Sequence, residues 1–152
     1  MIANDEYIFS VQEKSFIAFS LGPEPPVVVI KEGAECDGLY ELKDSYCTNS
    51  SCDCRYGVLT ARRQKREKIV LNVGWEKPSH YIKRGFPPEK AKLLRYGCLE
   101  SQKKNQPAYA QEFLSYFRKL MEEDPRLTDY MRNHYECAKI YGSSWNDPEA
   151  RE

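Results

Sequence analysis

The chain has 152 residues, which is enough for one ordinary domain that buries roughly 68–70% of the surface of its unfolded chain. Its 23 basic residues balance its 23 acidic residues, which argues against a histone-like protein that binds nucleic acid through net positive charge. No apolar run approaches the roughly 18 residues of a membrane helix, and the acidic start is unlike a secretory signal. We therefore expect a cytoplasmic protein with reduced cysteines and no membrane partner.

The first half of the chain has the pattern of short β-strands. Runs rich in β-branched and aromatic residues alternate with segments that contain proline, glycine or charged residues. These runs cover residues 7–11, 16–21, 27–30, 38–42, 56–61 and 69–73. The last two flank a basic segment, which predicts a hairpin with a charged tip. Residues 80–83 are predicted to add an edge strand.

The second half changes to the period of α-helices. The proline pair at 87–88 suits the first turn of a short helix. Between residues 109 and 121 apolar side chains recur every three or four positions, which predicts an amphipathic helix. Asp124 and Pro125 favour the start of a last helix that ends near Gly142, because the Asp124 carboxylate can accept hydrogen bonds from the first free amides.

This order of elements defines the predicted fold class. Strands followed by helices indicate an α+β protein, with a mostly antiparallel sheet in the N-terminal half and a C-terminal helical pair packed on it. We expect a single domain over residues 1–142 and a polar tail at 143–152.

Six cysteines are the unusual feature of the composition. Cys47, Cys52 and Cys54 lie close together, and the residues between the first two are only Thr, Asn and Ser, which turn readily. Such a backbone can direct its thiols to one point. Zinc is the natural occupant because it prefers thiolate and imidazole ligands in a tetrahedral array. Disulfides, buried unligated cysteines and redox chemistry are the alternatives.

A structural zinc site needs a fourth ligand. His134 is the favoured candidate because it falls on the predicted inner face of the last helix, and three thiolates plus a neutral imidazole leave less charge to bury than four thiolates. Cys36, eleven residues before the cluster, and Cys137, one turn from His134, are the alternatives. Arg55 is expected to supply a compensating cation.

The cysteine segment resembles a known pattern. Tyr46-Cys47, followed by Cys52-Asp53-Cys54-Arg55, is similar to a family of uncharacterised bacterial proteins that carry a Tyr-Cys-x4-Cys-Asp-Cys-Arg motif. Asp124-Pro125 and His134-Tyr135 also resemble the helical end of that family. The resemblance covers about a tenth of the chain through these motifs and the rest through element order. It implies a zinc-type site and no established activity.

The leading functional interpretation is a zinc-binding protein whose metal is structural, with a structural or protein-interaction role. The sequence has no Gly-rich phosphate loop, no His-Glu-x-x-His helix and no deaminase motif. A metal-dependent or thiol enzyme is one alternative, for which Cys137 beside His134 has the required spacing.

A nucleic-acid-binding module is the other alternative. The segment 55–68 contains Arg62, Arg63, Lys65 and Arg66, and a hairpin tip with these side chains could bind phosphates. The simpler interpretation is a solvated turn that protects the edge of a sheet.

Overall fold

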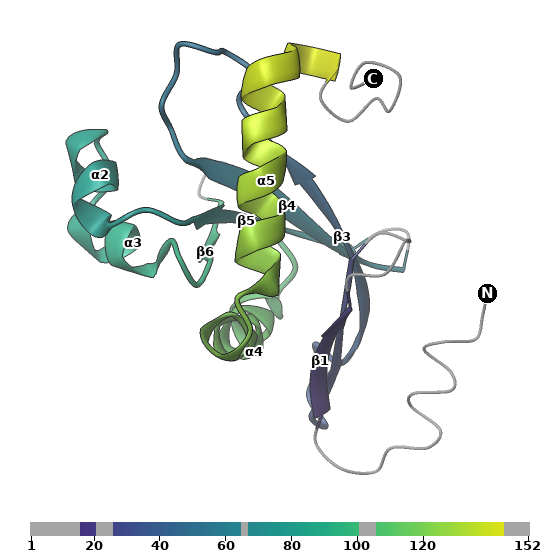
Figure 1. The fold of residues 1–152 in the computed structure, drawn as a ribbon. Coiled ribbons are helices and arrows are strands. Elements are labelled where there is room, and N and C mark those ends of the chain that lie inside the picture. The colour runs from purple at the N-terminus through teal and green to yellow at the C-terminus, as the bar shows by residue number, and fades with distance from the viewer. Residues whose placement is uncertain (1–15, 21–25, 65–66, 101–105, 145–152) are drawn as a thin grey trace.

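The computed structural model describes residues 16–20, 26–64, 67–100 and 106–144. Within these residues the chain forms a six-stranded antiparallel sheet whose strands lie in sequence order, followed by helices (Figure 1). The strands are β1 (Phe16–Ser20), β2 (Val27–Lys31), β3 (Gly38–Ser45), β4 (Tyr56–Arg63), β5 (Glu67–Gly74) and β6 (Cys98–Leu99). The predicted α+β class is confirmed. The strand expected at 7–11 and most of the expected tail at 143–152 lie outside the described residues.

The helices are α2 (Pro78–Lys83), α3 (Pro88–Leu93), α4 (Ala110–Glu123) and α5 (Arg126–Tyr141), followed by a 3-10 turn, η1 (Gly142–Ser144). The last two are the predicted helical pair. The Asp124 carboxylate accepts a hydrogen bond from the Arg126 backbone N–H at 3.1 Å, as expected for the start of α5.

The edge strand predicted at 80–83 is wrong, because these residues belong to α2. Pro78 stands at the start of this helix, where its missing N–H leaves no hydrogen bond unmade. The helical turn carries Tyr81 into a fully buried position. This tertiary contact outweighs the weak strand preference of four residues.

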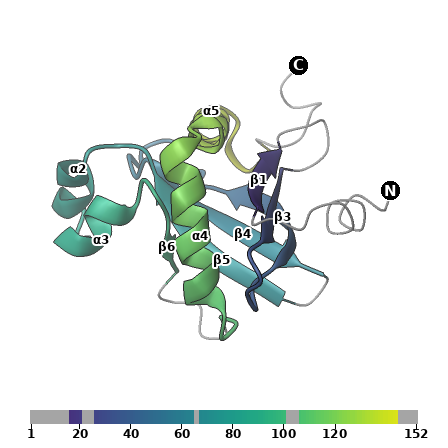
Figure 2. The same ribbon diagram turned by 90° about the horizontal axis from the view of Figure 1, so that it is seen from below.

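The main core lies between the sheet and the pair α4 and α5, which cover one face of the sheet (Figures 1 and 2). Alternate residues of the central strands point to that face, as the period of a strand requires. These residues are Tyr40, Leu42, Leu59, Ala61, Ile69, Leu71 and Val73, all buried. Phe113 and Phe117 of α4 pack against them, with the Phe113 ring 4.6 Å from that of Tyr40.

A second, smaller hydrophobic cluster joins α2 and α3 to the start of β4. Tyr81, Ala91 and Leu94 form its buried centre, and the partly exposed rings of Tyr56 and Phe86 pack against it. Figure 1 shows α2 and α3 beside the sheet, away from α5. The connection between β3 and β4 therefore has α5 on one side and α2 on the other.

Candidate metal centre

The predicted cysteine cluster lies in the connection between β3 and β4, residues 46–55, here called the cysteine loop. Asn49 shapes its turn: its side-chain oxygen accepts from the Ser51 N–H at 2.9 Å, and its carbonyl accepts from the Cys52 N–H at 3.0 Å. The Sγ atoms of Cys47, Cys52 and Cys54 all lie within 4.8 Å of one another. The structure thus brings together the three cysteines that the spacing singled out, in a group that could hold a metal ion.

The helix α5 holds one side of the cysteine loop. The Tyr135 hydroxyl accepts a hydrogen bond from the Arg55 backbone N–H at 3.1 Å, and the Lys139 ammonium donates to the Asn49 carbonyl at 2.9 Å. Tyr135 and Lys139 are one helical turn apart, so they present one face of α5 to the loop.

The helix α2 holds the other side. The buried Tyr81 hydroxyl donates to the Arg55 carbonyl at 2.6 Å and accepts from the backbone N–H groups of Trp75 and Glu76. The His80 ring lies 2.9 Å from the Asp53 carbonyl through Nε2. Arg55 itself has a φ of 56°, a left-handed conformation that is uncommon for a residue with a side chain. These contacts hold the backbone in the turn that aims Cys54 at the cluster.

The three thiols differ in exposure and in acidity. Cys54 is buried, Cys52 is partly exposed and Cys47 is exposed. A hydrogen bond from the Asn49 backbone lowers the pKa of Cys47, and the neighbouring thiols and Lys139 add to this effect. Burial raises the pKa of Cys52, as do its hydrogen bonds with the other two thiols. Cys47 is therefore suited to provide the first thiolate, which is the form that binds metals.

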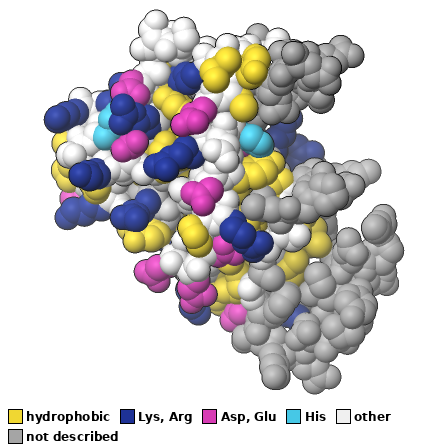
Figure 3. All heavy atoms as spheres, in the orientation of Figure 1, with side chains coloured by type: hydrophobic (Ala, Val, Ile, Leu, Met, Phe, Trp, Pro, Cys, Tyr) yellow, Lys and Arg dark blue, Asp and Glu magenta, His cyan; other side chains and the backbone are white. Residues whose placement is uncertain are grey.

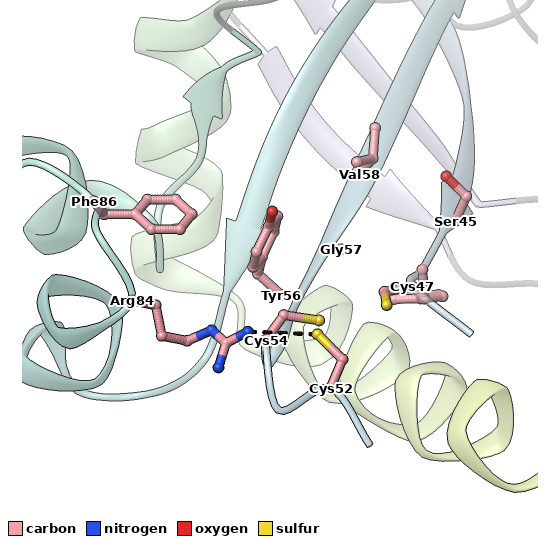
Figure 4. A pocket seen from close by; sticks show the side chains of 10 residues that line it. Ser45, Cys47, Cys52, Cys54, Tyr56, Gly57, Val58, Arg84 and Phe86 are labelled. Carbon is pink, nitrogen blue, oxygen red and sulfur yellow. Dashed lines mark hydrogen bonds between the residues drawn. The ribbon is translucent and has the colours of Figure 1, made fainter. Parts of the chain in front are cut away.

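Within the described residues, Arg84, which lies just beyond α2, is a cation that contacts one of the thiols. Its Nη2 atom donates to the Sγ atom of Cys52 at 3.4 Å (Figure 4). The expectation that Arg55 supplies this cation is wrong, because the Arg55 guanidinium pairs with Asp53 at 2.6 Å and with Glu76 at 3.4 Å. Arg84 is 32 residues from Cys52, and no local pattern in the sequence marks it.

The predicted fourth ligand, His134, is placed elsewhere. Its Nδ1 atom lies 2.6 Å from the Asp44 carboxylate, and its ring packs 4.2 Å from that of Tyr130. His134 is one residue, or about 100° of helix rotation, from Tyr135, which faces the cysteine loop. It is not among the donors that converge within 4.8 Å. Ligation by His134 stays a prediction.

The two alternative ligands also lie outside the cluster. Cys36 is fully buried in the main core, where burial raises the pKa of its thiol to about 12, and its N–H donates to the Glu112 carboxylate. Cys137 on α5 is partly exposed. In the described part of the chain, no fourth histidine, cysteine or carboxylate converges with the three thiols.

A pocket of about 450 Å³ borders the cysteine cluster (Figure 4). Its lining combines the three thiols with aromatic, aliphatic and polar groups. The lining residues are Ser45, Tyr46, Cys47, Cys52, Cys54, Tyr56, Gly57, Val58, Arg84 and Phe86. Tyr56 and Val58 alternate along β4 with the buried Gly57 and Leu59, so they lie on the face of the sheet opposite α4 and α5.

The basic hairpin predicted between β4 and β5 is present, but one of its cations is used internally. The Arg63 guanidinium contacts the Glu67 carboxylate at 2.8 Å and donates to the carbonyls of Glu35 and Asp37 at 2.8 and 2.7 Å. It also lies 4.2 Å above the Tyr109 ring. Arg62 is exposed. Lys65 and Arg66, the other two candidate phosphate contacts, lie outside the described residues.

No protein-family model, curated protein or solved structure matches this chain. The similarity of the cysteine segment to a bacterial family therefore stays a resemblance between motifs. Among the described residues, no helix has both the length and the apolar composition needed to span a membrane.

Proposed function

We propose that the protein binds one zinc ion through the thiolates of Cys47, Cys52 and Cys54. The observation that carries the proposal is the convergence of their Sγ atoms within 4.8 Å. Zn–S bonds of about 2.3 Å in a tetrahedral site separate two sulfurs by about 3.8 Å. Small side-chain rotations would thus bring these thiols to the spacing that zinc requires.

The donor set favours zinc over other common ions. Calcium and magnesium take oxygen ligands, whereas thiolates select zinc and other soft or borderline ions. Three thiolates around a divalent ion leave one net negative charge. The Arg84 guanidinium, 3.4 Å from Cys52, is placed to offset that charge.

We assign the metal a structural role, as a clamp on the cysteine loop. The loop is tied to α5 through Tyr135 and Lys139 and to α2 through Tyr81. A bound ion would add covalent-like links between Cys47 and Cys54, near the two ends of the same loop. Because ligand convergence belongs to the folded state, the free energy of metal binding is shared with folding. A structural or protein-interaction role for the whole chain is consistent with such a clamp.

Metal analysis and ligand variants test this proposal. We expect the full chain, purified under reducing conditions, to contain about one zinc per chain. Cys52→Ser and Cys54→Ser should each lose most of the metal and unfold at a lower temperature. Cys98→Ser is the matched control, because Cys98 is a buried thiol in β6 outside the loop. It should keep the zinc.

A wild-type chain without metal, in which Cys47, Cys52 and Cys54 react freely with a thiol reagent in the native state, would contradict the proposal. So would equal zinc content in the Cys52, Cys54 and Cys98 variants.

A further inference from the structure

The three-thiol cluster leaves one tetrahedral position of the proposed zinc without a protein ligand among the described residues, and a pocket borders that cluster. We propose that this pocket binds a small organic carboxylate with an apolar or aromatic body, which completes the coordination of the metal and contacts Arg84. This inference rests on the proposed zinc site. To the zinc site it adds a carboxylate ligand and assigns Arg84 to the recognition of that ligand.

Arg84 has the chemistry and the position to recognise a carboxylate. A guanidinium presents parallel N–H groups that match the two oxygens of a carboxylate. The Nη2 atom of Arg84 lies 3.4 Å from the Cys52 sulfur, so the guanidinium lies beside the coordination sphere of the proposed ion. Arg84 is exposed and forms no ion pair within the described residues. Its remaining N–H groups are thus available to a ligand.

The pocket walls fit the body of such a ligand. Tyr56 and Phe86 line it with their rings 5.3 Å apart, and both remain partly exposed. Val58 adds an aliphatic surface (Figure 4). The volume of about 450 Å³ falls within the range of roughly 300–1,000 Å³ that is typical of small-molecule sites. A bare ion such as chloride would leave these surfaces in contact with water.

Charge favours a singly charged ligand. The zinc with three thiolates and Arg84 sums to neutrality, and Lys139, which also acts on the Cys47 thiol, adds one positive charge. A monocarboxylate then leaves the site neutral, whereas a phosphate dianion leaves one negative charge. The surroundings attract anions, because the segment from Lys77 to Arg95 contains six lysines and arginines and one acid, Glu89. Figure 3 shows basic side chains gathered over α2 and α3. Such a positive surface raises the local concentration of anions.

Benzoate is the probe for this inference, and benzamide is its neutral control. The full chain is loaded with cobalt(II) in place of zinc, so that visible absorption reports the coordination sphere, and the zinc form is studied by calorimetry. We expect benzoate to bind saturably and to change the cobalt spectrum. Benzamide should do neither. Acetate should bind at least tenfold more weakly than benzoate because it lacks the ring that packs on Tyr56 and Phe86.

Variants separate this inference from the zinc proposal. Arg84→Gln should weaken benzoate binding at least tenfold while zinc content stays at the wild-type level. If Arg84→Gln loses zinc, Arg84→Lys is used in its place. It keeps the positive charge, so it should retain the zinc. It lacks the paired N–H groups of the guanidinium, so it should still bind benzoate more weakly than the wild type. Arg132→Gln, at an exposed arginine of α5 outside the pocket lining, should change neither quantity.

Two results would overturn the carboxylate site and leave the zinc proposal intact. One is a zinc-containing protein in which benzoate leaves the cobalt spectrum unchanged, or binds wild type and Arg84→Gln equally. The other is loss of zinc in His134→Ala, which would mean that the imidazole closes the site. A wild-type chain without zinc would overturn both proposals.

Discussion

The two connections at the ends of β4 use their side chains in different ways. The cysteine loop enters β4 and the basic hairpin tip, residues 62–68, leaves it, and each concentrates residues of one chemical type. In the loop the three thiols converge on one another and on Arg84. In the tip, the Arg63 guanidinium already binds groups of the same chain, namely the Glu67 carboxylate and two backbone carbonyls.

This difference separates a candidate binding site from a structural interaction. A group can bind a ligand only if its hydrogen-bonding and charge capacity is not already used by the protein. The Arg63 guanidinium is mostly buried, with 16% of its side chain exposed, and its donors are occupied. Among the described residues, no carboxylate converges with the three thiols, and a cation relieves their mutual repulsion as thiolates.

Removal of the metal should produce the largest difference between the two connections. If zinc is held at about a thousandfold above its dissociation constant, chelation lowers the free energy of unfolding by about 4 kcal/mol. For a chain of this size that corresponds to a fall of about 10 °C in the melting temperature. Amide hydrogen exchange should accelerate more strongly in residues 47–55 than at Arg62, Arg63, Glu67 and Lys68, where only the loss of global stability acts. Equal acceleration in both connections would mean that the metal does not act through the loop.

Substitution in the hairpin should have the next largest effect. Arg63→Gln leaves the Glu67 carboxylate and two carbonyls without their charged donor, so we expect a loss of about 2–3 kcal/mol in urea unfolding. Arg62→Gln, the exposed neighbour, should change the stability by no more than about 0.5 kcal/mol. If the two variants unfold alike, the distinction between an internal and an exposed arginine fails.

The smallest expected effect is a difference in reactivity among the cysteines of the metal-free chain. Because the Asn49 backbone lowers the pKa of Cys47 and burial raises that of Cys36 to about 12, Cys47 has the larger thiolate fraction at any pH below these values. Iodoacetamide near pH 8 should therefore alkylate Cys47 at least tenfold faster than Cys36 or Cys98, as measured by mass spectrometry. Added zinc should suppress the reaction at Cys47. Comparable rates at Cys36 would contradict this order.

Local sequence patterns predicted most of the fold. Runs rich in β-branched and aromatic residues marked the five longer strands, and the recurrence of apolar residues every three or four positions marked α4 and α5. The errors lay where a local signal is weak. Residues 80–83 have too few positions to show a period, and their structure follows from the burial of Tyr81. The two-residue strand β6 exists only as a partner of β5.

The candidate site likewise has one part that the sequence could predict and one part that it could not. The spacing of Cys47, Cys52 and Cys54 could be recognised because all three belong to one short loop, whose turn depends on neighbouring residues such as Asn49. The cation could not be recognised, since Arg84 meets Cys52 only through the placement of α2. The direction of the His134 side chain could not be predicted from helical periodicity alone, because a shift of one residue along a helix changes the direction of a side chain by about 100°.

The sequence by itself thus determined the class of fold, the hairpin and the three thiols, because each depends on interactions between residues close in the chain. Only the tertiary structure decided which cation meets the thiols, which arginine is used internally and where the pocket lies. Those features depend on contacts such as that between Arg55 and Tyr135, which are 80 residues apart. The direction of such a contact is set by the packing of whole elements, which no short pattern of residues encodes.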